Sequence, residues 1–110
     1  MSTSPRAVDI NRPAAVVASV IVKAAACDFY GFFGHNAGAT QYIQVHDSAT
    51  VPADTAVPLH TFRVEANQNF SFDTGKFPIH LRNGFVLCNS STLATKTIGS
   101  ANCWLIGQYK

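Results

Sequence analysis

The part of this chain that most constrains its fold is the last quarter, residues 83–110. It holds two apolar runs, residues 85–88 and 103–106, separated by a polar connection rich in Thr. Both runs are short, β-branched or aromatic and bounded by turn residues, which indicates strands rather than a helix. We predict that they pair as an antiparallel hairpin with Ser90 opposite Ala101, so that Cys88 lies opposite Cys103.

In this predicted hairpin apolar side chains meet on both faces, because Leu87 lies opposite Trp104 and Val86 opposite Leu105. A hairpin that is apolar on both sides needs cover on both sides. We expect the rest of the domain to cover one side and another sheet or subunit to cover the other. The sequence therefore predicts a β-sandwich that is complete only within an assembly.

The rest of the chain adds further short strands separated by turn signals. They are residues 15–23, 24–33, 40–46, 59–66, 69–73 and 79–81, with a Pro-containing loop at 47–58. Residues 40–46 alternate, with Ile43 and Val45 on one face, and residues 59–66 place His60, Phe62, Val64 and Ala66 inward. A helix is the competing interpretation of residues 14–26, because Ala favours helices. The pattern predicts an all-β, single-domain β-sandwich over residues 14–110, jelly-roll-like or immunoglobulin-like.

Residues 1–13 are mostly polar and cannot form a core, so we predict an extended N-terminal arm that is ordered along a neighbouring subunit or frayed. Its candidate contact residues are Arg6, Val8, Ile10 and Arg12. A competing interpretation of residues 12–27 is a lipoprotein-like signal that ends at Cys27.

Composition also favours a chain with partners. Charged residues make up 13% of the sequence, where roughly 25% is usual, so we expect partners to cover much of the outer surface. A neutral monomer with a polar, uncharged surface is the alternative. The net charge is only +2 and its cations are scattered, which argues against nucleic acid as a partner. No apolar stretch reaches the roughly 20 residues of a membrane span.

The reactive side chains form no recognisable catalytic or metal-binding pattern. The four His and three Cys lack metal-ligand spacing, and no nucleophile or phosphate-loop motif is present. We therefore predict no enzyme activity, no metal and no cofactor. Cys88 and Cys103 are interpreted as buried thiols, with a cross-strand disulfide as the alternative.

Four aromatic residues remain as candidates for binding a sugar ring or a partner: Tyr30, Tyr42, Trp104 and Tyr109. The last three are the predicted partner-contact residues. Tyr and Trp suit interfaces because they combine apolar area with a hydrogen-bonding group. The alternative for Trp104 is a place in the core. If the chain is a glycan-binding module, the platform on which a sugar ring stacks would be formed by Tyr42, His46 and Trp104.

Two segments, FYGFFGHNAGATQYIQVHDSATVPADTAVP and FPIHLRNGFVLCNSSTLATKTIGSANCWLIGQY, resemble small virion structural proteins of tailed bacteriophages. The likeness covers about residues 30–109. It implies a non-catalytic virion protein assembled in the bacterial host cytoplasm, here expected to be a capsid decoration (cement) protein. Such a protein would be a homotrimer or homodimer that binds the major capsid protein. A receptor- or glycan-binding module of a head fibre, tail or baseplate is the alternative.

Overall fold

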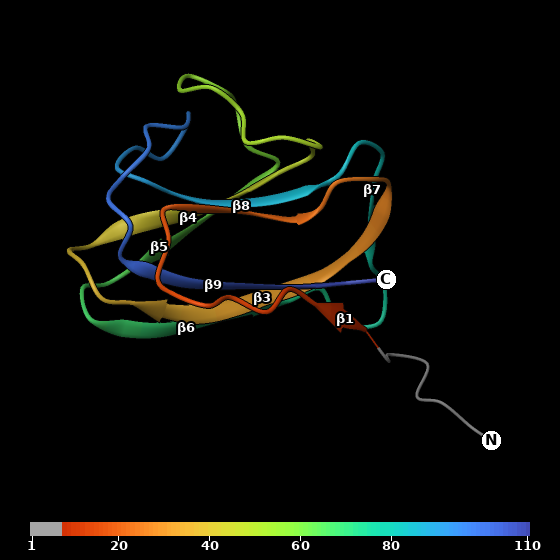
Figure 1. The fold of residues 1–110 in the computed structure, drawn as a ribbon, viewed down its shortest axis with the longest axis horizontal. Coiled ribbons are helices and arrows are strands. Elements are labelled where there is room, and N and C mark those ends of the chain that lie inside the picture. Colours follow the sequence, from red (N-terminus) through yellow and green to blue (C-terminus); the bar gives the residue numbers. More distant parts are fainter. Residues whose placement is uncertain (1–7) are drawn as a thin grey trace.

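Nine strands and no helix make up residues 8–110, the part of the chain that the computed structural model describes (Figure 1). The strands are β1 (Asp9–Ile10), β2 (Ser19–Lys23), β3 (Cys27–Asn36), β4 (Gln41–His46), β5 (His60–Val64), β6 (Gln68–Asp73), β7 (Ile79–Leu81), β8 (Phe85–Ser90) and β9 (Cys103–Tyr109). The prediction of an all-β chain is confirmed. Residues 14–26 contain strand β2 rather than a helix.

The strands form two antiparallel sheets, which Figure 1 shows as two layers. The β9 sheet has the order β1-β9-β3-β6, and β7 also pairs with β3. The β8 sheet has the order β2-β8-β4-β5. Long loops between β4 and β5 and between β8 and β9 leave the layers on the side of the β8 sheet (Figure 1).

Alternation along the strands sends one set of side chains into the space between the sheets. Ile43 and Val45 of β4 are completely buried, and β5 adds the buried Val64 and the half-buried Phe62. These inward faces were predicted from the sequence. Ala66 was predicted to face inward too, but it is exposed because β5 ends at Val64.

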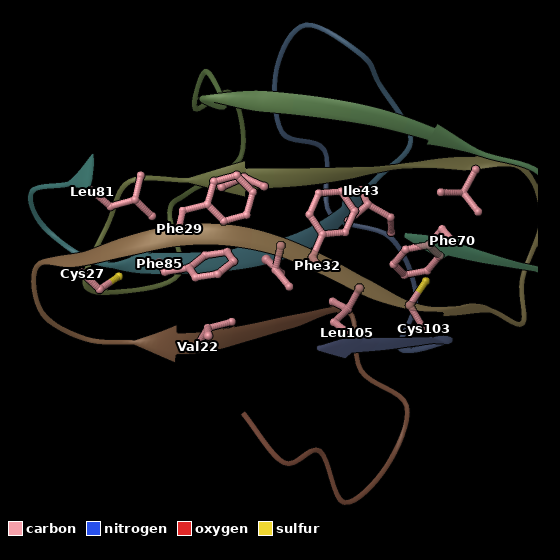
Figure 2. Packing of buried hydrophobic residues seen from close by; sticks show 13 residues of the cluster. Val22, Cys27, Phe29, Phe32, Ile43, Phe70, Leu81, Phe85, Cys103 and Leu105 are labelled. Carbon is pink, nitrogen blue, oxygen red and sulfur yellow. The ribbon is translucent and has the colours of Figure 1, made fainter. Parts of the chain in front are cut away.

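Phenylalanine rings from both sheets form the centre of the core (Figure 2). Phe29 of β3 meets Phe85 of β8 edge-on with ring centroids 5.0 Å apart, and Phe32 meets Phe62 of β5 at 5.8 Å. Full burial of such a side chain contributes about 1.5–3 kcal/mol, and edge-on ring pairs add about 0.5–1.5 kcal/mol. These contacts across the layers hold the two sheets together.

The predicted hairpin of the last two strands is wrong. β8 lies between β2 and β4 in one sheet, and β9 lies between β1 and β3 in the other. Cys88 is opposite Gln44, whereas Cys103 is opposite Asn36, and both thiols are free and buried. A two-faced apolar strand fits the middle of either sheet as well as it fits a hairpin. Residues 91–102 are long enough to cross from one layer to the other.

The described part of the N-terminal segment lies along the chain's own β9. Asp9 pairs with Tyr109 and Ile10 with Gln108, so β1 is an edge strand of the β9 sheet. Asn11 continues the ladder with its side chain, because Nδ2 donates to Leu105 O at 2.8 Å and Oδ1 accepts from Gly107 N at 2.7 Å. Residues 8–11 thus contact their own domain, where the sequence suggested a neighbouring subunit or a frayed end.

Candidate functional site

The outer face of the β8 sheet is covered by two loops of the same chain, residues 47–59 and 91–99, which we call the loop cover. The loops pair with each other through their backbones: Thr55 N donates to Lys96 O and Lys96 N donates to Ala56 O, both at 2.8 Å. Asp54 adds a side-chain contact, since its Oδ1 accepts from Ile98 N at 3.1 Å. The loop cover is therefore an ordered layer with its own hydrogen bonds.

Polar side chains of the sheet hold the loop cover in place from below. Gln44 is fully buried, and its Nε2 donates to Thr92 O and Thr95 O at 3.1 Å. Ser90 Oγ donates to Thr92 O at 2.9 Å and accepts from Thr97 N at 3.0 Å. Because these bonds go to loop backbone, they fix the loop's path and leave its side chains free to vary.

An ion pair joins the two loops. Lys96 Nζ lies 3.0 Å from Asp54 Oδ1, and the two side chains are 4% and 50% exposed. The hydrogen bond from Lys96 lowers the pKa of Asp54. Burial lowers the pKa of His46, and Lys96 acts in the same direction. His46, a member of the predicted glycan platform, is 3% exposed and lies beneath the loop cover.

The loop cover exposes apolar side chains among polar ones such as Thr50, Asp54 and Thr92. Five large aliphatic residues lie on it, with exposed fractions from 39% to 77%: Val51, Val57, Leu59, Leu93 and Ile98. These are half of the ten large hydrophobic residues found exposed in residues 8–110. Because the loops already have hydrogen-bond partners below, this apolar surface contributes little to the core and is available for contact with another molecule.

A second apolar surface lies on the outer face of the β9 sheet, which we call the β9 face. Register places Trp104 opposite His35 and Ile106 opposite Phe33, on the side away from the core residues Leu105 and Phe32. Trp104 is 37% exposed, and Phe33, His35 and Ile106 are half-buried. His35 Nδ1 lies 2.7 Å from Asn69 Oδ1 on β6. The β9 face was missed as a unit, because the predicted hairpin placed Trp104 opposite Leu87.

The predicted contact residues are spread over the molecule. Tyr42 is half-buried on β4, opposite Arg63, whereas Trp104 is in the other sheet. Tyr109 packs against the core, with Lys23 Nζ 5.9 Å from its ring centre. The predicted platform of Tyr42, His46 and Trp104 is therefore not assembled.

The arm residues are also accounted for as far as the structure describes them. Val8 is half-buried, Ile10 is 37% exposed and Arg12 is exposed. Arg6 lies outside the described residues. Ile10 thus belongs to the edge strand β1, which pairs with β9 of the same chain.

Buried amides surround Cys103 at one end of the core. Gln41 Nε2 donates to Asn36 Oδ1 at 2.7 Å and to Asn102 Oδ1 at 2.9 Å, and Asn89 Nδ2 donates to Ser100 O at 2.6 Å. Burial raises the pKa of the Cys103 thiol and raises that of Cys88 to about 11. Both thiols are therefore protonated near neutral pH and poor nucleophiles. The network fixes the chain where it crosses between the sheets.

Within residues 8–110 no pocket is found, and no group of three or more His, Cys, Asp or Glu side chains is placed to hold a metal ion. No helix in this part of the chain is long and apolar enough to span a membrane. The two apolar surfaces are thus the candidate functional sites.

Comparison of the chain with protein-family models, curated proteins and solved structures gave no match.

Proposed function

We propose that this chain is a non-catalytic structural protein of a bacteriophage virion, which binds the major capsid protein through the loop cover and stabilises the assembled shell. The observation that carries the proposal is the loop cover itself. It is an ordered layer, hydrogen-bonded to the sheet beneath it, that exposes Val57 at 77% and Leu93 at 57%. An apolar surface of this kind is stabilised when a partner removes it from water.

Strand order supports a jelly roll as the finer description of the fold. Leaving out β7, the sheets read 1-9-3-6 and 2-8-4-5, so that the first four strands alternate between layers. In an immunoglobulin sandwich the first two strands share a sheet. Jelly rolls occur in viral capsid proteins and also in lectins and cupins, so the fold agrees with the proposal and does not by itself select it.

The proposed mechanism is mass action. A protein that binds the assembled shell and not its separated subunits shifts the equilibrium toward the shell by RT ln(1 + [L]/Kd), about 2.7 kcal/mol at a hundredfold excess over Kd. No bond is made or broken. The chain would work as a homo-oligomer whose copies bridge neighbouring capsid subunits.

Binding to shells that lack this protein tests the proposal. We expect Val57→Glu combined with Leu93→Glu to weaken shell binding at least tenfold, because two carboxylates would be desolvated at the contact. Circular dichroism and the thermal midpoint should stay at their wild-type values, since both side chains are exposed. Ile79→Glu, at a 42% exposed position on β7, is the matched control and should bind normally. Unchanged binding by the double variant would contradict the proposal.

A receptor- or glycan-binding module is the second candidate. It is favoured by the exposed Trp104 opposite His35, whose Nδ1 lies 2.7 Å from Asn69 Oδ1. An indole ring flanked by hydrogen-bonding groups suits stacking on a sugar ring. Copy number separates the two candidates. A decoration protein should approach the copy number of the major capsid protein, whereas a fibre or tail module should be far scarcer. A glycan array signal lost in Trp104→Ala would support the module.

A further inference from the structure

We infer that the β9 face is a self-association surface, on which one copy of this chain packs its sheet against the same sheet of another copy. The inference goes beyond shell binding, which the proposed function assigns to the loop cover on the opposite sheet. It depends on the composition of the β9 face, on its area and on the different cover of the two outer faces.

Within residues 8–110, loops cover the outer face of the β8 sheet, whereas the β9 face still exposes Trp104. On the β8 sheet, outward residues such as Gln44 and His46 are buried under the loop cover. On the β9 sheet, outward Trp104 remains 37% exposed at the position opposite His35. An antiparallel sheet with one face in water normally carries polar residues there. Phe33, Trp104 and Ile106 break that pattern at the centre of the face.

The centre of the β9 face carries no acidic side chain and no Lys or Arg. Its outward positions on β9, β3 and β6 are Trp104, Ile106, Gln108, Phe33, His35, Asn69 and Ser71, with Asp28 and Asp73 at the margins. Symmetric association brings identical surfaces together, so a charged face would meet like charge. A neutral face with apolar side chains at its centre and amides around them avoids this repulsion. This composition favours a second copy as the occupant.

The area of the face allows a weak contact. The strands β1, β9, β3 and β6 hold 2, 7, 10 and 6 residues, and at about 3.3 Å per residue and about 4.8 Å per strand they give roughly 400 Å². Two copies would bury about 800 Å², which is below the usual size of stable interfaces and typical of weak, transient ones. Sheets packed in this way lie about 10 Å apart, a distance that Trp104 and Phe33 side chains can fill. We therefore expect weak association.

Trp104 provides a direct probe, because it is the single tryptophan of the sequence. Sedimentation velocity and Trp emission should be followed over rising concentration, up to about 1 mM, where even a contact worth about −4 kcal/mol is half-formed. We expect a dimer or larger closed oligomer, with Trp104 emission shifting to shorter wavelength and acrylamide quenching falling as it forms.

Two variants test the surface. Ile106→Glu should weaken association at least tenfold, and Ser71→Lys, at an exposed position that tolerates a long polar side chain, should do the same if Ile106→Glu fails to fold. Ile21→Glu, on β2 of the other sheet at 43% exposure, is the matched control and should associate normally. A chain that stays monomeric with constant Trp104 emission overturns the inference, as does an oligomer that both β9-face variants leave intact. Neither outcome decides the proposed shell binding, because that binding is measured separately with the loop-cover variants.

Discussion

The ammonium group of Lys96 lies beneath the loop cover, with 4% of the side chain exposed. It forms an ion pair with Asp54, whose side chain is 50% exposed. The two partners are therefore not equivalent. Loss of the carboxylate would leave a buried cation without its partner, whereas loss of the cation would leave a carboxylate that water can solvate.

We predict that Asp54→Asn lowers the thermal midpoint more than Lys96→Met does. Methionine fills a similar volume without burying charge, and Asp54 would still accept from Ile98 N. Thermal unfolding followed by circular dichroism measures the difference. Glu65→Gln is the control: it removes one partner of the exposed Arg63–Glu65 pair and should leave the midpoint unchanged. Equal decreases in the thermal midpoint for Asp54→Asn and Lys96→Met would show that burial of the Lys96 charge does not affect stability.

His46 should make stability depend on pH. Burial lowers its pKa below the ordinary value of 6.5, and the nearby Lys96 acts in the same direction. The unfolded chain therefore binds a proton that the folded chain does not. The free energy of unfolding should be fully maintained above about pH 6.5 and should fall as pH drops below it.

We expect His46→Gln to reduce this loss of stability at low pH. Burial also lowers the pKa of His60, so His60 should contribute another part of the loss. Urea unfolding between about pH 7.5 and 5.5 measures the profile. Above about pH 7 the stability profiles of the wild type and of His46→Gln should run parallel, since the imidazole is neutral in both the folded and the unfolded chain there. Parallel profiles across the whole range would contradict the assignment to His46.

At the scale of the strands, β9 depends on a close approach to the core. A Cβ added to Gly107 would lie 2.7 Å from the Phe85 ring and 2.8 Å from Val22 Cγ2. Gly107→Ala should therefore lower the free energy of unfolding by about 1–3 kcal/mol through overpacking. Urea unfolding should show this lower free energy with an unchanged dependence on urea concentration. A stabilised variant would mean that the Phe85 ring has room to move.

The side chain of Asn11 takes the place of two backbone groups beside β9. Asn11→Ala leaves Leu105 O and Gly107 N without these bonds, which we expect to cost about 1–3 kcal/mol. Detachment of the N-terminal segment should follow, measured as faster proteolytic cleavage before residue 17. An unchanged cleavage rate would mean that β1 alone holds the segment.

Strands were easiest to predict where one face is polar. Alternation found β4, β5 and β6, with Phe62 correctly placed inward, and residues 79–81 were found as β7. The pairing of β8 with β9 was wrong because all six residues of β8 are buried, and a strand buried on both faces carries no periodic signal for its neighbour. The loop cover was missed because it buries polar Gln44 and His46, which sequence patterns assign to a surface.

At the scale of the whole molecule, the low charge content determines how association should respond to salt. With 13% charged residues and a net charge of +2, both proposed contacts would depend on apolar burial. Raising NaCl from about 0.05 to 0.5 M shortens the screening length from roughly 14 to 4 Å. We predict less than about a threefold change in the dissociation constant, measured by sedimentation or shell binding. A steep loss with salt would point to ion pairs at the contact.

The loop cover also separates the proposed recognition surface from the residues that hold the loops in place. Its course is set by Gln44 and Ser90, which bind loop backbone, while Val57 and Leu93 point to solvent. Substitutions at the tips can therefore retarget the protein to a different surface without disturbing the sheets. If the proposed shell binding holds, a few loop replacements would let such a chain follow a changing particle surface in evolution, and in the laboratory the exposed positions 57 and 93 offer sites for displaying a foreign peptide.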